Sequence, residues 1–110
     1  MGSFVKGDVV ILPFPFSDLS GARRRPALVV AELRGDDLIV CQITSQSRSD
    51  AYGVPLSPGD FASGALNQES TVRPNRLFTA DSRVIADRAG TLRSDRVDAV
   101  IDRIVSLLGR

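Results

Sequence analysis

Histidine is absent from this 110-residue sequence, and cysteine occurs only once. The first absence removes the commonest general base and metal ligand of proteins, so any catalysis would depend on carboxylates, hydroxyls, Arg, Lys or Tyr. The second rules out an intramolecular disulfide and a cysteine-rich metal site, and we expect no bound metal and no cofactor. Cys41 stands in an apolar run, where a buried structural thiol is expected.

Long apolar runs, tryptophan and a large net charge are also missing. No run approaches the roughly 18 apolar residues of a membrane span, and no secretion signal opens the chain, so we expect a cytoplasmic protein without membrane contact. Aromatic residues make up 5% of the sequence, which disfavours an adaptor groove for proline-rich ligands. The formal net charge of +1 gives no global attraction to nucleic acid, so a local patch would have to supply it.

The remaining composition is that of an ordinary globular protein, with 43% hydrophobic and 25% charged residues. The length suits one domain, which we place at residues 1–110. Apolar, β-branched runs predict strands at Val9–Leu12, ending at Pro13, and at Pro26–Glu32 and Leu38–Thr44. The last two are joined by a turn containing Gly35 and Asp36, which indicates an antiparallel hairpin.

The second half of the chain predicts shorter elements. Residues 45–67 read as a surface excursion with apolar anchors, followed by strands at Ser70–Arg73, stopped by Pro74, and at Leu77–Thr79, and a possible one at Arg83–Ile85. The anchors are Val54, Leu56, Phe61 and Leu66.

The last segment predicts an amphipathic helix, with Ser94 as N-cap, Asp95 in the first turn and Gly109 just beyond its end. Its apolar residues follow helical spacing at Val97, Val100, Ile101, Ile104, Val105 and Leu108. The fold class is therefore mainly β with a C-terminal helix, a small bent barrel of five to seven strands with the helix laid on it.

Two cationic segments are candidates for binding phosphate. Arg23, Arg24 and Arg25 close a loop that begins at Phe14, and such guanidinium groups suit phosphates and flat bases. Strand alternation would point Arg25 and Arg24 in opposite directions. The segment Arg73-Pro74-Asn75-Arg76 carries two more cations around an amide. A solvated charge cluster and ordinary turn chemistry are the respective alternatives.

A polar run, Thr44-Ser45-Gln46-Ser47, begins where the third strand leaves the apolar core. Strand ends hold polar groups rigidly and expose them, which suits recognition, although an ordinary strand-to-loop transition explains the same residues. Phosphate-binding glycine loops, a nucleophile elbow and a metal-ligand cluster are all missing.

Taken in order, several segments resemble the MazF/PemK family of bacterial toxin endoribonucleases. They are Gly7-Asp8-Val9-Val10, Pro13-Phe14-Pro15-Phe16-Ser17-Asp18-Leu19-Ser20-Gly21, Arg24-Arg25-Pro26-Ala27-Leu28-Val29-Val30, Ile43-Thr44-Ser45-Gln46, Val54-Pro55-Leu56, Ser70-Thr71-Val72-Arg73-Pro74 and the final helix. Each piece alone is weakly specific, but the ordered set spans nearly the whole chain.

The resemblance implies an SH3-like barrel that forms a homodimer, cleaves single-stranded RNA at short sequences and is neutralised by a cognate antitoxin protein. It implies a catalytic pair at Arg25 and Thr44 and a further functional arginine at Arg73. In some members an Asp follows two residues after that arginine, whereas this chain has Asn75, which cannot accept a proton as a carboxylate does.

We expect RNA cleavage by attack of the 2′-OH on the adjacent phosphorus, which needs alignment, charge stabilisation and proton transfer but no metal. Recognition of unstacked bases should come from amides, hydroxyls and flat surfaces. The expected RNA-binding residues are Phe16, Ser17, Arg24, Ser45, Gln46, Arg73 and Asn75.

Two alternatives stay open. Asn75 could mark a member of the family that binds RNA or antitoxin without cutting. A gyrase-poisoning toxin shares this barrel, and fold alone does not settle function.

Overall fold

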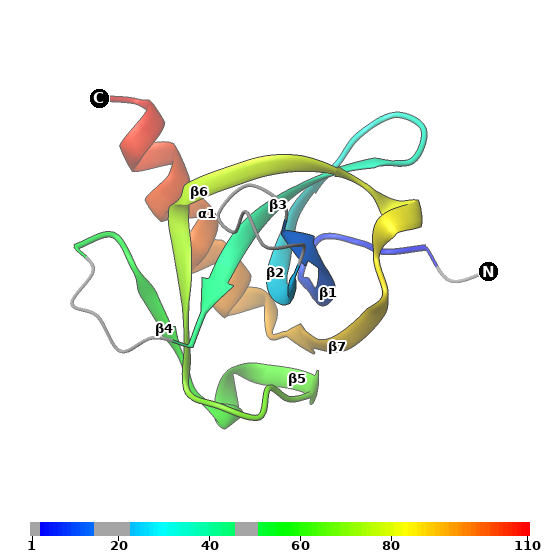
Figure 1. Ribbon diagram of the computed structural model, residues 1–110. Helices are drawn as coiled ribbons and strands as arrows, with labels where there is room; N and C mark the ends of the chain where they lie inside the picture. Colours follow the sequence, from blue (N-terminus) through cyan, green and yellow to red (C-terminus); the bar gives the residue numbers. More distant parts are fainter. Residues whose placement is uncertain (1–2, 15–22, 46–50) are drawn as a thin grey trace.

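The computed structural model describes residues 3–14, 23–45 and 51–110 of the chain. Seven strands form one antiparallel sheet in the order β4-β6-β3-β2-β1-β7-β5, and α1 (Ser94–Leu108) follows at the C-terminus (Figure 1). The expected class, mainly β with a C-terminal helix, is confirmed, and the sheet forms a half-barrel. The strands are β1 (Asp8–Phe14), β2 (Arg23–Glu32), β3 (Asp37–Thr44), β4 (Val54–Leu56), β5 (Phe61–Gly64), β6 (Ser70–Asp81) and β7 (Asp87–Leu92).

Successive side chains of each strand point to opposite faces of the curled sheet. Apolar side chains are buried on both of these faces. One face packs against α1 through Leu28, Cys41, Ile43 and Val72, among others. The other face encloses a second cluster, to which the N-terminal Phe4 is added. This second cluster consists of Val10, Leu12, Ala27, Val29, Leu38, Val40 and Ala80.

The β2–β3 hairpin is the centre of the sheet and was predicted from its turn. Gly35 has φ 72°, a conformation that L side chains rarely adopt, and this permits the tight reversal. The antiparallel register pairs Val29 with Val40 and Ala27 with Gln42. This register shows which side chains of β2 and β3 lie on the same face of the sheet.

The start of the sheet corrects two predictions. The first strand continues through Pro13, which pairs with Arg24, instead of ending there. β7 accompanies β1 only as far as Ile11, so Pro13 lies on an open edge, where a missing N–H is tolerated. Arg23–Arg25 open β2 rather than close a loop, and the loop residues 15–22 lie outside the described residues.

β6 is one strand of 12 residues, although Pro74 was expected to divide it into two. The register shifts from Ile43–Val72 to Cys41–Leu77, so residues 73–76 of β6 lie opposite Gln42 alone. Four residues opposite one form a special β-bulge, and a bulge is one of the few places where a sheet accepts proline. Pro74 is among the fully buried side chains, and the strand bends there without ending.

The segments on either side of β6 also differ from the predicted elements. The excursion contains β4, the short helix η1 (Pro58–Asp60) and β5, while its anchors Val54 and Leu56 are buried as expected. No strand forms at Arg83–Ile85: η2 (Ser82–Val84) begins there because the Asp81 carboxylate accepts a hydrogen bond from the Arg83 N–H. The strand lies further on, as β7.

α1 confirms the predicted helix but with different ends. Ser94 is its first residue and Arg93 its N-cap, and Gly109 caps the C-terminus through its N–H. Val97, Val100 and Ile104 are buried against the sheet, and each contributes about 2 kcal/mol by leaving water. The predicted face was too wide, because Val105 is 62% and Leu108 74% exposed. No helix among the described residues is long and apolar enough to cross a membrane.

Candidate functional site

The catalytic pair expected from the sequence lies at one end of the central hairpin. Arg25 is near the start of β2 and Thr44 is the last residue of β3, both two residues beyond the Ala27–Gln42 pair. Leu12 pairs with Arg25, and alternation places both on the face of the second cluster. Arg25 and Thr44 are half-buried at the point where this cluster ends.

The β6 bulge brings Arg73 to the same end. Thr44 pairs with Thr71, and Arg73 follows two residues later, at the first position of the bulge. The bulge takes the Arg73 carbonyl out of the regular ladder, and the Cys41 thiol donates a hydrogen bond to it at 2.8 Å. Burial raises the pKa of Cys41 to about 12, so the thiol keeps its proton at neutral pH. The free, buried cysteine thus supports the strand that carries Arg73.

Sequence reasoning missed one residue of this face, Gln42. It lies between Val40 and Thr44 in the alternation of β3, opposite Ala27. Its Oε1 is buried and finds no hydrogen-bond partner among the described residues, which costs about 1–3 kcal/mol. A polar residue two positions before Thr44 in an otherwise apolar strand was the available signal.

Several arginines at this end have no ion-pair partner among the described residues, as is also the case for Arg34 and Arg103 elsewhere in the chain. Arg83, Arg88, Arg93 and Arg96 each form an ion pair with an aspartate. Within the described part of the chain, no such ion pair involves Arg24, Arg25 or Arg76. Unneutralised guanidinium groups are available to a phosphate, with which they form short, charge-assisted and often bidentate hydrogen bonds.

A hollow continues from the site along β4 and β6. A cavity of about 410 Å³ is lined by Ser45, Thr71 and Gln68, with Leu56 and Pro55 as its apolar part. It shares five lining residues with a neighbouring cavity of about 260 Å³ that reaches Phe61 and Leu66. Hydroxyls, an amide and apolar surface together suit an unstacked base, as protein sites for single-stranded RNA do. Both cavities also contain one carboxylate, that of Glu69.

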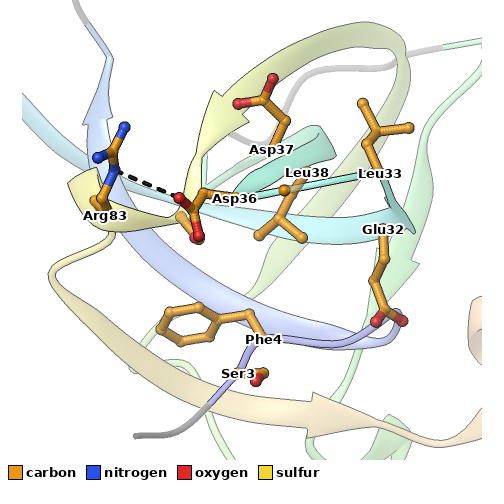
Figure 2. A pocket seen from close by; sticks show the side chains of 10 residues that line it. Ser3, Phe4, Glu32, Leu33, Asp36, Asp37, Leu38 and Arg83 are labelled. Atoms are coloured by element: carbon orange, nitrogen blue, oxygen red, sulfur yellow. Dashed lines mark ion pairs between the residues drawn. The ribbon is translucent and has the colours of Figure 1, made fainter.

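A further cavity, larger than these two at about 470 Å³, lies at the opposite end of the hairpin. Figure 2 shows its lining, which includes Phe4 and the carboxylates of Glu32, Asp36 and Asp37, and in which Arg83 reaches toward Asp36 at 3.9 Å. Glu32 lies seven positions after Arg25 in β2, or roughly 23 Å along the strand. Its carboxylates would repel phosphate, so we place the candidate site at the arginine end despite the smaller cavities there.

The other predicted site residues fall into three groups. Ser45 and Asn75 are exposed near the site, Ser45 just after β3 and Asn75 in the bulge. Arg24 is exposed, but alternation places it on the face of β2 opposite Arg25. Phe16, Ser17 and Gln46 lie outside the described residues.

Fold and site together define a class of protein: a small β half-barrel with hydroxyl groups and unneutralised arginines at one strand end. The profile of the PemK-like, MazF-like toxins of type II toxin–antitoxin systems matches residues 5–108. The chain belongs to this family. No curated protein matches the sequence.

Solved structures share the fold. MazF from Deinococcus radiodurans is 22% identical with a TM-score of 0.79, and the match covers 100% of both chains. A MazE–MazF structure from the same organism gives 23% identity, a TM-score of 0.78 and 98% coverage of each chain. An endoribonuclease in complex with its cognate antitoxin, from a mycobacterial species, gives 15% identity, a TM-score of 0.77 and coverage of 97% of this chain and 96% of that one. At such identities the likeness concerns the fold alone.

Proposed function

We propose that this chain is the toxin of a type II toxin–antitoxin system and acts as a metal-independent endoribonuclease on single-stranded RNA. The observation that carries the proposal is the arginine end of the sheet, where Arg25 has no carboxylate partner among the described residues and shares a face with Thr44. Membership of the toxin family adds the biological setting. The expected substrate is messenger RNA, cut at a short sequence in the cytoplasm.

The proposed reaction is a transesterification within the RNA. The 2′-oxygen attacks the adjacent phosphorus, the bond to the 5′-oxygen breaks, and the products are a 2′,3′-cyclic phosphate and a 5′-hydroxyl end. Arg25 donates hydrogen bonds to the phosphate oxygens as their negative charge grows, and the Thr44 hydroxyl donates another. In this proposal Arg25 also protonates the departing 5′-oxygen. The 2′ proton passes to solvent water, which returns a proton to Arg25, and no side chain is assigned as its acceptor.

Base recognition would use the neighbouring hollow. Ser45 and Thr71 place hydroxyls at its entrance, and Leu56 and Pro55 give it an apolar wall for the face of a base. Asn75 in the bulge offers an amide to a base edge, and Arg73 a cation to the backbone. Phe16, Ser17, Arg24 and Gln46 remain predicted RNA contacts.

We further propose that the chain works as a homodimer and is inhibited by a cognate antitoxin. A related mycobacterial endoribonuclease occurs in complex with its antitoxin, and related MazF chains occur with MazE. The cations at the arginine end would attract an acidic segment of the antitoxin. That segment would then compete with RNA for the same cations.

The test is incubation of the purified protein with a long single-stranded RNA in EDTA, followed by mapping of the new ends. We expect discrete cuts with 5′-hydroxyl ends, and a rate lowered on the order of 100- to 1000-fold in Arg25→Ala. Arg34→Ala is the matched control, because it removes an exposed arginine from the hairpin turn at the opposite end. Equal cleavage by Arg25→Ala and the wild type would refute the assigned role.

The second candidate function is RNA or antitoxin binding without cleavage. Asn75 favours it, since an amide stands where some relatives have a carboxylate. Intact RNA with the folded wild-type protein, together with RNA binding that Arg25→Ala weakens, would support it. Asn75→Asp would then be the variant to assay for restored cleavage.

A further inference from the structure

The least satisfied polar atom on the face of the candidate site is the Oε1 of Gln42. Being buried, it is closed to solvent, and no donor among the described residues reaches it. Native proteins rarely leave such an acceptor unpaired, and a catalytic role is one of the explanations for such an atom. The question is which donor reaches it when RNA is bound.

Arg25 is the donor that the register favours. Gln42 pairs with Ala27, so Arg25 is its diagonal neighbour on the same face, within reach of a long side chain. The guanidinium carries five N–H donors, and Arg25 has no ion-pair partner in the described part of the chain. RNA itself is a poorer match, because a buried oxygen is not open to a ligand arriving from solvent.

We propose that Gln42 is a positioning residue, whose Oε1 accepts a hydrogen bond from Arg25 and thereby aims the guanidinium at the scissile phosphate. This inference rests on the proposed function. One N–H of the planar group would be held by Gln42, which leaves the opposite edge to face the phosphate oxygens. No donor among the described residues reaches Oε1 in the free protein, and the proposed contact forms when the site is assembled around substrate.

If this is correct, Gln42 lowers the stability of the fold and raises the activity of the enzyme. Gln42→Met keeps the length and volume of the side chain and removes the unpaired oxygen, so the thermal midpoint should stay the same or rise. The turnover number kcat should fall by roughly 10- to 100-fold while KM changes by less than about twofold, because alignment is lost and binding is not. A structural role would lower stability and activity together.

The experiment measures kcat, KM and thermal unfolding on a short RNA containing a mapped cut site. Ile39→Met is the control, because it places the same side chain in β3 on the opposite face. Gln42→Glu keeps an acceptor oxygen and should be at least about fivefold more active than Gln42→Met. If Gln42→Met does not fold, Gln42→Glu takes its place as the test variant.

A spectroscopic readout tests the contact itself. In complex with an RNA carrying 2′-deoxyribose at the cut site, the Arg25 Nε–H signal should become protected from exchange in the wild type and in Gln42→Glu, but not in Gln42→Met. Unchanged kcat, a raised KM at constant kcat, or protection that persists in Gln42→Met would overturn the inference. Failure of the wild type to cut RNA would instead refute the proposed function beneath it.

Discussion

Replacing Cys41 with alanine tests whether its thiol supports the bulge that carries Arg73. The thiol is fully buried and donates to the Arg73 carbonyl at 2.8 Å. Losing the buried sulfur costs about 1 kcal/mol in burial and cavity terms, and leaving the carbonyl without a donor costs about 1 kcal/mol more. A loss of about 2 kcal/mol lowers the melting temperature of a chain of this size by about 9 °C.

The matched variant is Cys41→Ser, which is nearly isosteric and keeps a donor. If the hydrogen bond matters, the serine hydroxyl replaces the thiol and the serine variant is more stable than the alanine variant. If the site only requires an apolar group, the order is reversed, because the hydroxyl is then buried without benefit. Urea and thermal unfolding of the three proteins measure the order. Alanine equal to or above serine would refute the assigned role of the thiol.

Three further predictions concern charge and backbone. The pKa of Asp81, lowered to about 2 by its hydrogen bonds with Arg83, should rise toward its ordinary value in Arg83→Ala, as followed by NMR titration. Because the folded pKa is depressed, this pair stabilises the fold above about pH 4 and loses that effect as the pH falls toward 2. Gly64→Ala should destabilise by at least about 2 kcal/mol in urea unfolding, since φ is +69° and a Cβ would lie 2.2 Å from the Ala89 carbonyl oxygen; wild-type stability would contradict this. Arg73→Ala should weaken RNA binding for all sequences and reduce the salt slope by about 1, and an unchanged slope would argue against a phosphate contact.

The elements that the sequence predicted well are those whose pattern is local. The hairpin could be predicted from Gly35 between two β-branched runs, and α1 from the helical spacing of its apolar residues. β7 was missed because Asp87–Leu92 contains a glycine and two charges and becomes a strand only between β1 and β5. There Gly90 allows the two backbones to approach closely, which no single-strand propensity reveals.

Pro74 is a second case, at the site, in which local sequence could not predict the strand. A proline normally ends a strand, and only the pairing of β3 with both halves of β6 shows that the chain continues. Resemblance located Arg25, Thr44 and Arg73, and the structure brings them to one end of the sheet. It could not locate Gln42, whose interest comes from the burial of one atom rather than from its residue type.

The two ends of the β2–β3 hairpin give this nearly neutral chain an electric dipole. Carboxylates at Glu32, Asp36 and Asp37 outnumber the cations Arg34 and Arg83 at the turn, while arginines without an ion-pair partner gather roughly 23 Å away at the strand ends. A polyanion approaching in solution would feel this asymmetry before contact and would meet the molecule arginine end first. Association should therefore be fast at low ionic strength and slow steeply with salt, although the formal net charge is only +1.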